Sequence, residues 1–102
     1  MKTFRIYCGL DTNGHFHPEI ARQTAERLAL KYFPHGHTIY EATGRWQSDA
    51  VAVSEATLII EVMIDERTGA QAKVYELAGV YKERCHQESV MVTETQVEAS
   101  FV

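Results

Sequence analysis

The chain lacks most of the features that reveal a function directly. Its 10 basic residues are scattered singly and are outnumbered by 14 acidic ones, which gives a net charge of −4. A nucleic-acid partner is therefore not expected, because such partners need a concentrated positive face. No apolar run approaches the ~20 residues that span a bilayer, so we expect no membrane association. A glycine-rich phosphate loop, a Ser-His-Asp series and a nucleophile elbow are also missing.

Cysteine is scarce as well. Cys8 and Cys85 are the only two, and neither lies in a CxxC or metal-ligand spacing. Both fall in apolar patterns, which predicts small buried side chains and leaves a disulfide between them open. The N-terminal segment has neither the apolar core nor the small-residue cleavage site of a signal peptide, so we expect a cytoplasmic protein.

What is present fits a single domain over residues 1–102. The apolar fraction is 45% and the charged fraction is 24%, which are ordinary globular values. Apolar alternation and β-branched content predict strands along the chain. These are Phe4–Leu10, Thr38–Trp46, Val51–Ile64, and a terminal strand over Ser89–Thr95 and Val97–Val102 that bends near Gln96.

Two helices are predicted between the strands. The first begins at Pro18, which suits the first helical position, and Pro34 stops it. The second follows Thr68 and Gln71, which have the spacing of a capping box, and its apolar stripe runs to Cys85.

The predicted order β-α-β-β-α-β indicates an α+β, ferredoxin-like fold. Both helices then cover one face of a four-stranded antiparallel sheet. The other face stays open and carries apolar side chains that water solvates poorly. Packing two such faces together buries them, so we expect a homodimer through the open sheet face.

Five short motifs in order support a family resemblance. They are Tyr7-Cys8-Gly9-Leu10, Phe33-Pro34-x-Gly36-x-Thr38, Gly44-Arg45-Trp46, Glu55 and Gln87-Glu88-Ser89-Val90. Together they resemble the domain of unknown function 3574 family of small bacterial proteins, over nearly the whole chain. The resemblance implies a small α+β domain and no established activity.

The candidate ligand site centres on Arg45, Trp46 and Glu55. One interpretation is a pocket in which Trp46 is an aromatic platform, Arg45 an anion fork and Glu55 its orienter or a proton acceptor. The alternative is a cross-strand salt bridge between Arg45 and Glu55, with Trp46 as a core anchor.

Tyr7, His35 and His37 complete the set of predicted ligand-binding residues. Tyr7 is assigned to the open sheet face, either in a cleft or in a dimer interface. His35 and His37, like His15 and His17, have a His-x-His spacing that suits a shared metal, but no third ligand follows at a recognisable spacing, so no metal and no cofactor is predicted.

Three functions compete on this evidence. The first is a homodimer that binds a small anionic or nucleotide-like metabolite near Arg45 and Trp46. The second is a cofactor-free acid/base enzyme in which His37 or Glu55 takes a proton and Arg45 holds an oxyanion, although no residue is assigned as catalytic. The third is an interaction module or inhibitor that uses acidic surface residues. These are Glu61, Asp65, Glu66, Glu94 and Glu98.

Overall fold

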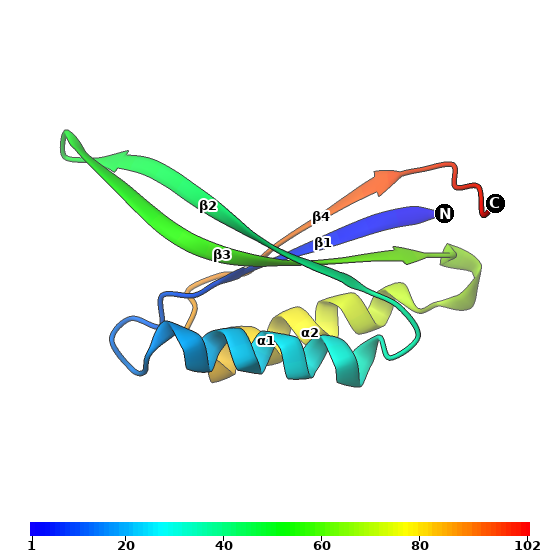
Figure 1. The fold of residues 1–102 in the computed structure, drawn as a ribbon, viewed down its shortest axis with the longest axis horizontal. Coiled ribbons are helices and arrows are strands. Elements are labelled where there is room, and N and C mark those ends of the chain that lie inside the picture. The colour runs from blue at the N-terminus through cyan, green and yellow to red at the C-terminus, as the bar shows by residue number, and fades with distance from the viewer.

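The chain folds as one antiparallel sheet with two helices on one of its faces, as Figure 1 shows. A computed structural model describes all residues from Met1 to Val102. The strands are β1 (Lys2–Gly9), β2 (Thr38–Ser48), β3 (Val51–Ile64) and β4 (Met91–Gln96), and the helices are α1 (Pro18–Tyr32) and α2 (Gln71–Arg84). All strand pairs are antiparallel and the strand order is β2-β3-β1-β4. The ferredoxin-like α+β prediction is confirmed.

The core lies between the sheet and the two helices. Strand side chains alternate between the two faces, so Phe4, Ile6 and Cys8 of β1 point toward the helices and are at most 1% exposed. Their antiparallel partners in β3 are Val62, Ile60 and Leu58. The small residues of α1 and the larger ones of α2 pack against this layer. They include Ala21, Ala25, Leu28, Ala29, Val74, Leu77 and Tyr81.

Both helices begin close to the predicted places, but only α1 has a side-chain cap. His17 is the N-cap of α1, and its Nδ1 accepts a hydrogen bond from the backbone N–H of Glu19 at 3.1 Å. The predicted capping box of α2 does not form. Thr68 belongs instead to a short 3₁₀ helix, η1 (Glu66–Thr68), and α2 starts after Ala70 without a side-chain cap.

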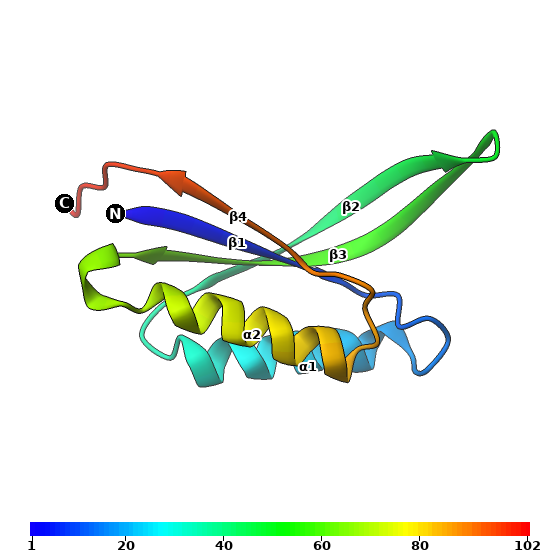
Figure 2. The same cartoon turned by 180° about the vertical axis from the view of Figure 1, so that it is seen from behind.

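The C-terminal strand is shorter than predicted. β4 ends at Gln96, and Val97–Val102 has no strand structure. The strand ends here because Lys2, the first residue of β1, is already paired with Gln96, so β1 offers no further partner. Val97 N–H donates to the carbonyl of Met1 at 3.1 Å, which holds the two ends side by side in both views (Figure 2).

The β2–β3 hairpin projects beyond the rest of the sheet (Figure 1). The last residue of β1 is paired with Thr57 of β3, so the sheet partners of residues 43–56 all lie within the hairpin. We call this segment, Thr43–Ala56, the hairpin arm. Its turn consists of Asp49 and Ala50, which have positive φ angles of 47° and 64°. The first strand of the hairpin therefore continues to Ser48, two residues beyond the predicted end at Trp46, and the turn has only two residues.

Neither helix of the structure has the length and apolar character needed to cross a lipid bilayer.

Candidate functional site

A pocket of about 360 Å³ opens on the uncovered sheet face where the hairpin arm leaves the sheet. Four separate parts of the chain meet there: the end of β1, the two strands of the arm, and the segment that leads into β4. Its lining residues are Tyr7, Gly9, Ala42, Thr43, Gly44, Glu55, Thr57, Gln87, Ser89 and Met91. No lysine, arginine or histidine is among them, and Glu55 is the only residue with a carboxylate.

Gly9 makes room for the polar groups of this pocket. A Cβ atom at position 9 would lie 2.7 Å from Oε1 of Gln87 and closer still to Oε1 of Glu55. Both distances are below van der Waals contact, so any side chain at this position displaces these two groups. The absence of a side chain therefore lets two oxygen acceptors converge on one point of β1.

Gln87 is held in a single orientation. Its Nε2 donates to the carbonyl of Asp11 at 2.6 Å and to the carbonyl of Cys85 at 3.0 Å. Carbonyls only accept hydrogen bonds, so the amide nitrogen must face them and Oε1 must face the pocket. The pocket thus receives a fixed acceptor from a loop that is distant in sequence from β1.

Glu55 is only partly engaged by the protein. Its Oε1 accepts a long hydrogen bond of 3.4 Å from the backbone N–H of Asp11, and no arginine or lysine pairs with it. A carboxylate has about four acceptor sites, so most of its capacity faces the pocket. Tyr7, Thr57 and Ser89 add hydroxyl groups to the same lining.

A hydrogen bond from the core supports the floor of the pocket. The hydroxyl of Tyr81, a fully buried residue of α2, donates to the carbonyl of Gly9. Burial raises the pKa of this hydroxyl far above its ordinary value, so it remains a donor at any physiological pH. The bond fixes the end of β1 at the point on which Glu55 and Gln87 converge.

The predicted Arg45–Glu55 pair does not form. In the β2–β3 register Arg45 lies opposite Ser54, and Glu55 lies opposite Gly44. Successive residues of a strand point to opposite faces, so the guanidinium and the carboxylate are on different sides of the arm. Glu55 therefore neither orients Arg45 in a pocket nor forms a cross-strand salt bridge with it.

Trp46 is neither a core anchor nor a wall of this pocket. It lies on the arm opposite Val53, is 49% exposed, and is not among the residues that line the cavity. Trp46 and Glu55 point to the same face of the arm, but Trp46 lies closer to the turn. The structure thus separates Arg45 and Trp46 from Tyr7 and Glu55.

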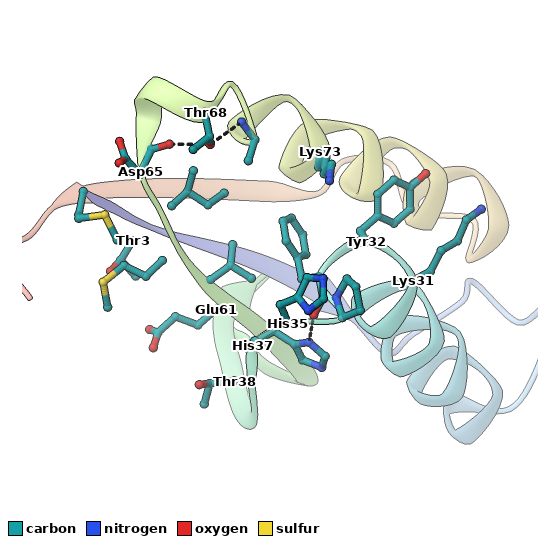
Figure 3. A pocket seen from close by; sticks show the side chains of 18 of the residues that line it. Thr3, Lys31, Tyr32, His35, His37, Thr38, Glu61, Asp65, Thr68 and Lys73 are labelled. Carbon is teal, nitrogen blue, oxygen red and sulfur yellow. Dashed lines mark hydrogen bonds between the residues drawn. The ribbon is translucent and has the colours of Figure 1, made fainter. Parts of the chain in front are cut away.

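The two His-x-His pairs do not converge with a third metal ligand. The ring of His15 stacks on that of His86 with 3.6 Å between centroids, whereas His17 caps α1. His35 and His37 line a second cavity, at the opposite end of the sheet (Figure 3). Nδ1 of His37 lies 2.8 Å from the carbonyl of Phe33 and donates to it, which braces the loop after α1.

The fold and the pocket define a small ferredoxin-like domain with a polar site on its uncovered sheet face. The chain belongs to the family described as protein of unknown function (DUF3574), whose model matches residues 6–101. The resemblance inferred from the five motifs is thereby confirmed. Among curated proteins, no sequence matches the chain significantly.

Several solved structures share the fold. A phage SAM lyase in complex with S-methyl-5′-thioadenosine is 20% identical, with a TM-score of 0.61 over 93% of this chain and 80% of that one. The same kind of enzyme in its apo state gives a TM-score of 0.63 at 20% identity, over 92% and 78% of the two chains. The periplasmic divalent cation tolerance protein CutA from Archaeoglobus fulgidus is 17% identical, with a TM-score of 0.55 over 99% and 88%.

Most motifs of the family resemblance meet at the open-face pocket. Tyr7 and Gly9 come from the first motif, Gly44 from the third, Glu55 is the fourth, and Gln87 begins the last. Of these, only Tyr7 and Glu55 were predicted as ligand-binding residues. Gln87 was missed as a site residue, although its motif was recognised, because its place beside Gly9 depends on a long-range contact. Tyr81 was missed because its position on an apolar stripe predicts packing alone.

Proposed function

We propose that this protein binds a small molecule in the open-face pocket, and that the bound part of the ligand carries a positive charge or several hydrogen-bond donors. The observation that carries the proposal is the convergence of Glu55 and Gln87 on Gly9, with no cationic side chain in the lining. Acceptors on the protein require donors on the ligand, and a carboxylate favours a cation. This replaces the expectation of an anionic ligand held by Arg45.

The fold neighbours suggest which compounds to test first. One of them holds S-methyl-5′-thioadenosine and is described as acting on SAM. SAM is a sulfonium cation with an amino-acid side chain, whereas S-methyl-5′-thioadenosine lacks that chain and is a neutral thioether. The pair therefore separates recognition of the nucleoside, which both compounds contain, from recognition of the charged groups that only SAM carries.

Calorimetry with both compounds tests the proposal. We expect the wild-type chain to bind SAM, and Glu55→Gln to weaken SAM binding about tenfold or more while S-methyl-5′-thioadenosine binding changes little, because only SAM loses a charge interaction. Glu98→Gln removes a carboxylate outside the pocket and is the matched control. Unchanged SAM affinity in Glu55→Gln would contradict the site, and failure of both compounds to bind would contradict this ligand class.

Acid/base catalysis is the second candidate function, and Glu55 favours it. A carboxylate that is largely free of protein partners, in a pocket that Tyr7 also lines, is suited to accept a proton from a bound substrate. Chromatographic analysis of SAM incubated with the protein measures turnover. Turnover that disappears in Glu55→Gln while binding survives supports an enzyme, and binding without turnover supports a binding protein.

An acidic docking surface is less favoured by the ion pairs. Arg5 contacts Glu61 at 2.7 Å, Arg67 contacts Asp65 at 2.6 Å, and Lys2 contacts both Glu66 and Glu94 at 3.1 Å. Four of the five proposed acidic residues thus already have a basic partner. Little unpaired negative charge remains there to occupy a basic site on another protein.

We also propose that two copies associate through the open sheet face. Tyr40, Met63 and Met91 on this face are between 38% and 56% exposed, which leaves apolar surface along the open face. Light scattering coupled to size exclusion measures the mass, and a dimer gives twice the 11.6 kDa of one chain. Met63→Lys should shift the protein toward the monomer, whereas Leu30→Lys on exposed α1 should not. A monomer at all concentrations would contradict the association.

A further inference from the structure

A second cavity, of about 800 Å³, lies at the end of the sheet where β1 begins and β3 ends. It lies among the loop after α1, the last residues of β3 and the start of α2 (Figure 3). The open-face pocket contains Tyr7 and Gly9 from the other end of β1, and no residue lines both cavities. The two are separate sites.

Eight of the 19 residues that line this cavity are hydrophobic, so part of its wall is apolar. Phe33 and Pro34 line it from the loop, and Val62, Met63 and Ile64 line it from β3. A cavity of this size is within the range of drug-sized ligands, and apolar walls usually contact the body of such a ligand. The charged groups at its edge then select which ligand enters.

The carboxylates of the cavity are already neutralised. Glu61 accepts from Nε of Arg5 at 2.7 Å and from the hydroxyl of Tyr40 at 3.3 Å. Asp65 forms an ion pair with Arg67, and the hydrogen bonds from Arg67 lower the pKa of that carboxyl to about 2. Figure 3 shows Glu61 and Asp65 on the strand side of the cavity, away from its lysines.

The lysines of the cavity have no such partners. Lys31 and Lys73 take part in none of the six ion pairs of the chain. Lys31 lies over the ring of Tyr32, with Nζ 5.5 Å from its centroid, and Lys73 is in the first turn of α2. Figure 3 places Lys31, Tyr32 and Lys73 together on the helix side. The net charge that a ligand meets there is positive.

We propose that this cavity binds an organic anion, with its apolar body against Phe33 and β3 and its acidic group near Lys31 and Lys73. A carboxylate, sulfonate or phosphate supplies the required charge. Two uncompensated ammonium groups beside an apolar wall match such an amphipathic ligand in both charge and hydrophobicity.

The test uses two fluorescent probes that differ in charge. 8-Anilinonaphthalene-1-sulfonate carries a sulfonate, and N-phenyl-1-naphthylamine has the same aromatic body without it. We expect the double variant Lys31→Gln/Lys73→Gln to raise the Kd of the sulfonate about fivefold or more, because the sulfonate loses two ion pairs near the surface. The Kd of the neutral probe should stay unchanged. Lys82 is on α2, like Lys73, but does not line the cavity, so Lys82→Gln should alter the Kd of neither probe.

Amide chemical shifts recorded with the sulfonate locate the site. Perturbation of residues 33–38 and 61–65 supports the proposal. It is overturned if the sulfonate Kd is unchanged in the double lysine variant, if the sulfonate does not bind the wild type, or if the perturbed amides are those of Tyr7, Gly9 and Gln87. Because the probe and the cavity differ from those of the open-face experiment, either proposal can fail without the other.

Discussion

The inner half of β3, Leu58–Ile64, pairs with β1 along its whole length and with β2 as far as Glu61, and the helices pack against one of its faces. The outer half, Val51–Ala56, pairs with β2 alone. Five residues of the inner half are no more than 5% exposed, whereas Val51 is 63% exposed. One continuous strand thus serves two environments. The open-face pocket lies where they meet, because Glu55 and Thr57 flank the point at which β1 ends.

The contrast between the two halves explains how Glu55 is both positioned and accessible. Hydrogen bonds and burial hold the inner half in place. Glu55 is one step beyond it, close enough to be oriented and open enough to meet a ligand. A site at such a boundary is both ordered and reachable.

Thiol reactivity should show the largest difference between the two environments. Burial raises the pKa of Cys8, which pairs with Leu58 in the inner half, to about 12. A cysteine introduced on the arm by Ser54→Cys replaces an exposed residue opposite Arg45, and a nearby guanidinium favours the thiolate. At pH 7.5 we expect the arm cysteine to react with iodoacetamide more than about a thousandfold faster, since the thiolate is the reactive species.

Mass spectrometry of timed samples measures both rates. Unfolding in guanidinium should bring all the cysteines to similar rates, which shows that the fold causes the difference. Rapid labelling of Cys8 in the native protein would show that the helix-covered core is open.

Side-chain truncation should show the next largest difference. Ile60 is fully buried, so Ile60→Ala should lower the free energy of unfolding by about 2–5 kcal/mol. Val51→Ala, on the arm, should lower it by less than about 0.5 kcal/mol. Urea unfolding followed by circular dichroism measures both. Comparable losses from the two changes would indicate that something covers the arm in solution.

The arm turn offers a smaller effect of the opposite sign. Ala50 has a φ of 64°, a left-handed conformation that costs an alanine roughly 1 kcal/mol and costs glycine little. Ala50→Gly should therefore stabilise the protein by about 0.5–1 kcal/mol, as thermal unfolding can show. Ala52→Gly, in the extended arm strand, should have no stabilising effect. Destabilisation by Ala50→Gly would mean that the turn adopts another conformation.

The smallest effect is expected from Trp46→Ala. Because the indole is half exposed on the arm, its removal should change the unfolding free energy by no more than about 0.5 kcal/mol in a single chain. Trp46 is the only tryptophan, so quenching of its fluorescence by iodide reports its exposure. Quenching that weakens as protein concentration rises would place the arm in a contact between copies.

The sequence was sufficient for the architecture because burial leaves a regular signal. Phe4, Ile6 and Cys8 alternate with half-exposed residues, and that alternation predicts both the strand and the face it buries. The predicted C-terminal strand is too long, because β4 ends at Gln96. Val97–Val102 looks strand-like in composition, but a strand also needs a partner, and β1 supplies none beyond Lys2.

The site was predicted only in part, because its residues meet through register and long-range contact. The places of Arg45 and Glu55 on one hairpin predict a pair, but the turn at Asp49 and Ala50 puts the two side chains on opposite faces. An Asn-Gly pair would have indicated this two-residue turn, but Asp-Ala does not. Tyr7 and Glu55 were identified, whereas the contribution of Gln87 depends on a loop from beyond α2.

The loops around the open-face pocket are tied to one another by their own polar groups. Gln87 donates to the carbonyl of Asp11, the side-chain amide of Asn13 donates to the carbonyl of His86, and the N–H of Leu10 donates to the carbonyl of Ala56. Opening any one of these segments breaks bonds to another. Their backbone amides should therefore exchange with deuterium as one cooperative unit, and a molecule that settles beside Glu55 should slow that exchange as far away as the last turn of α2.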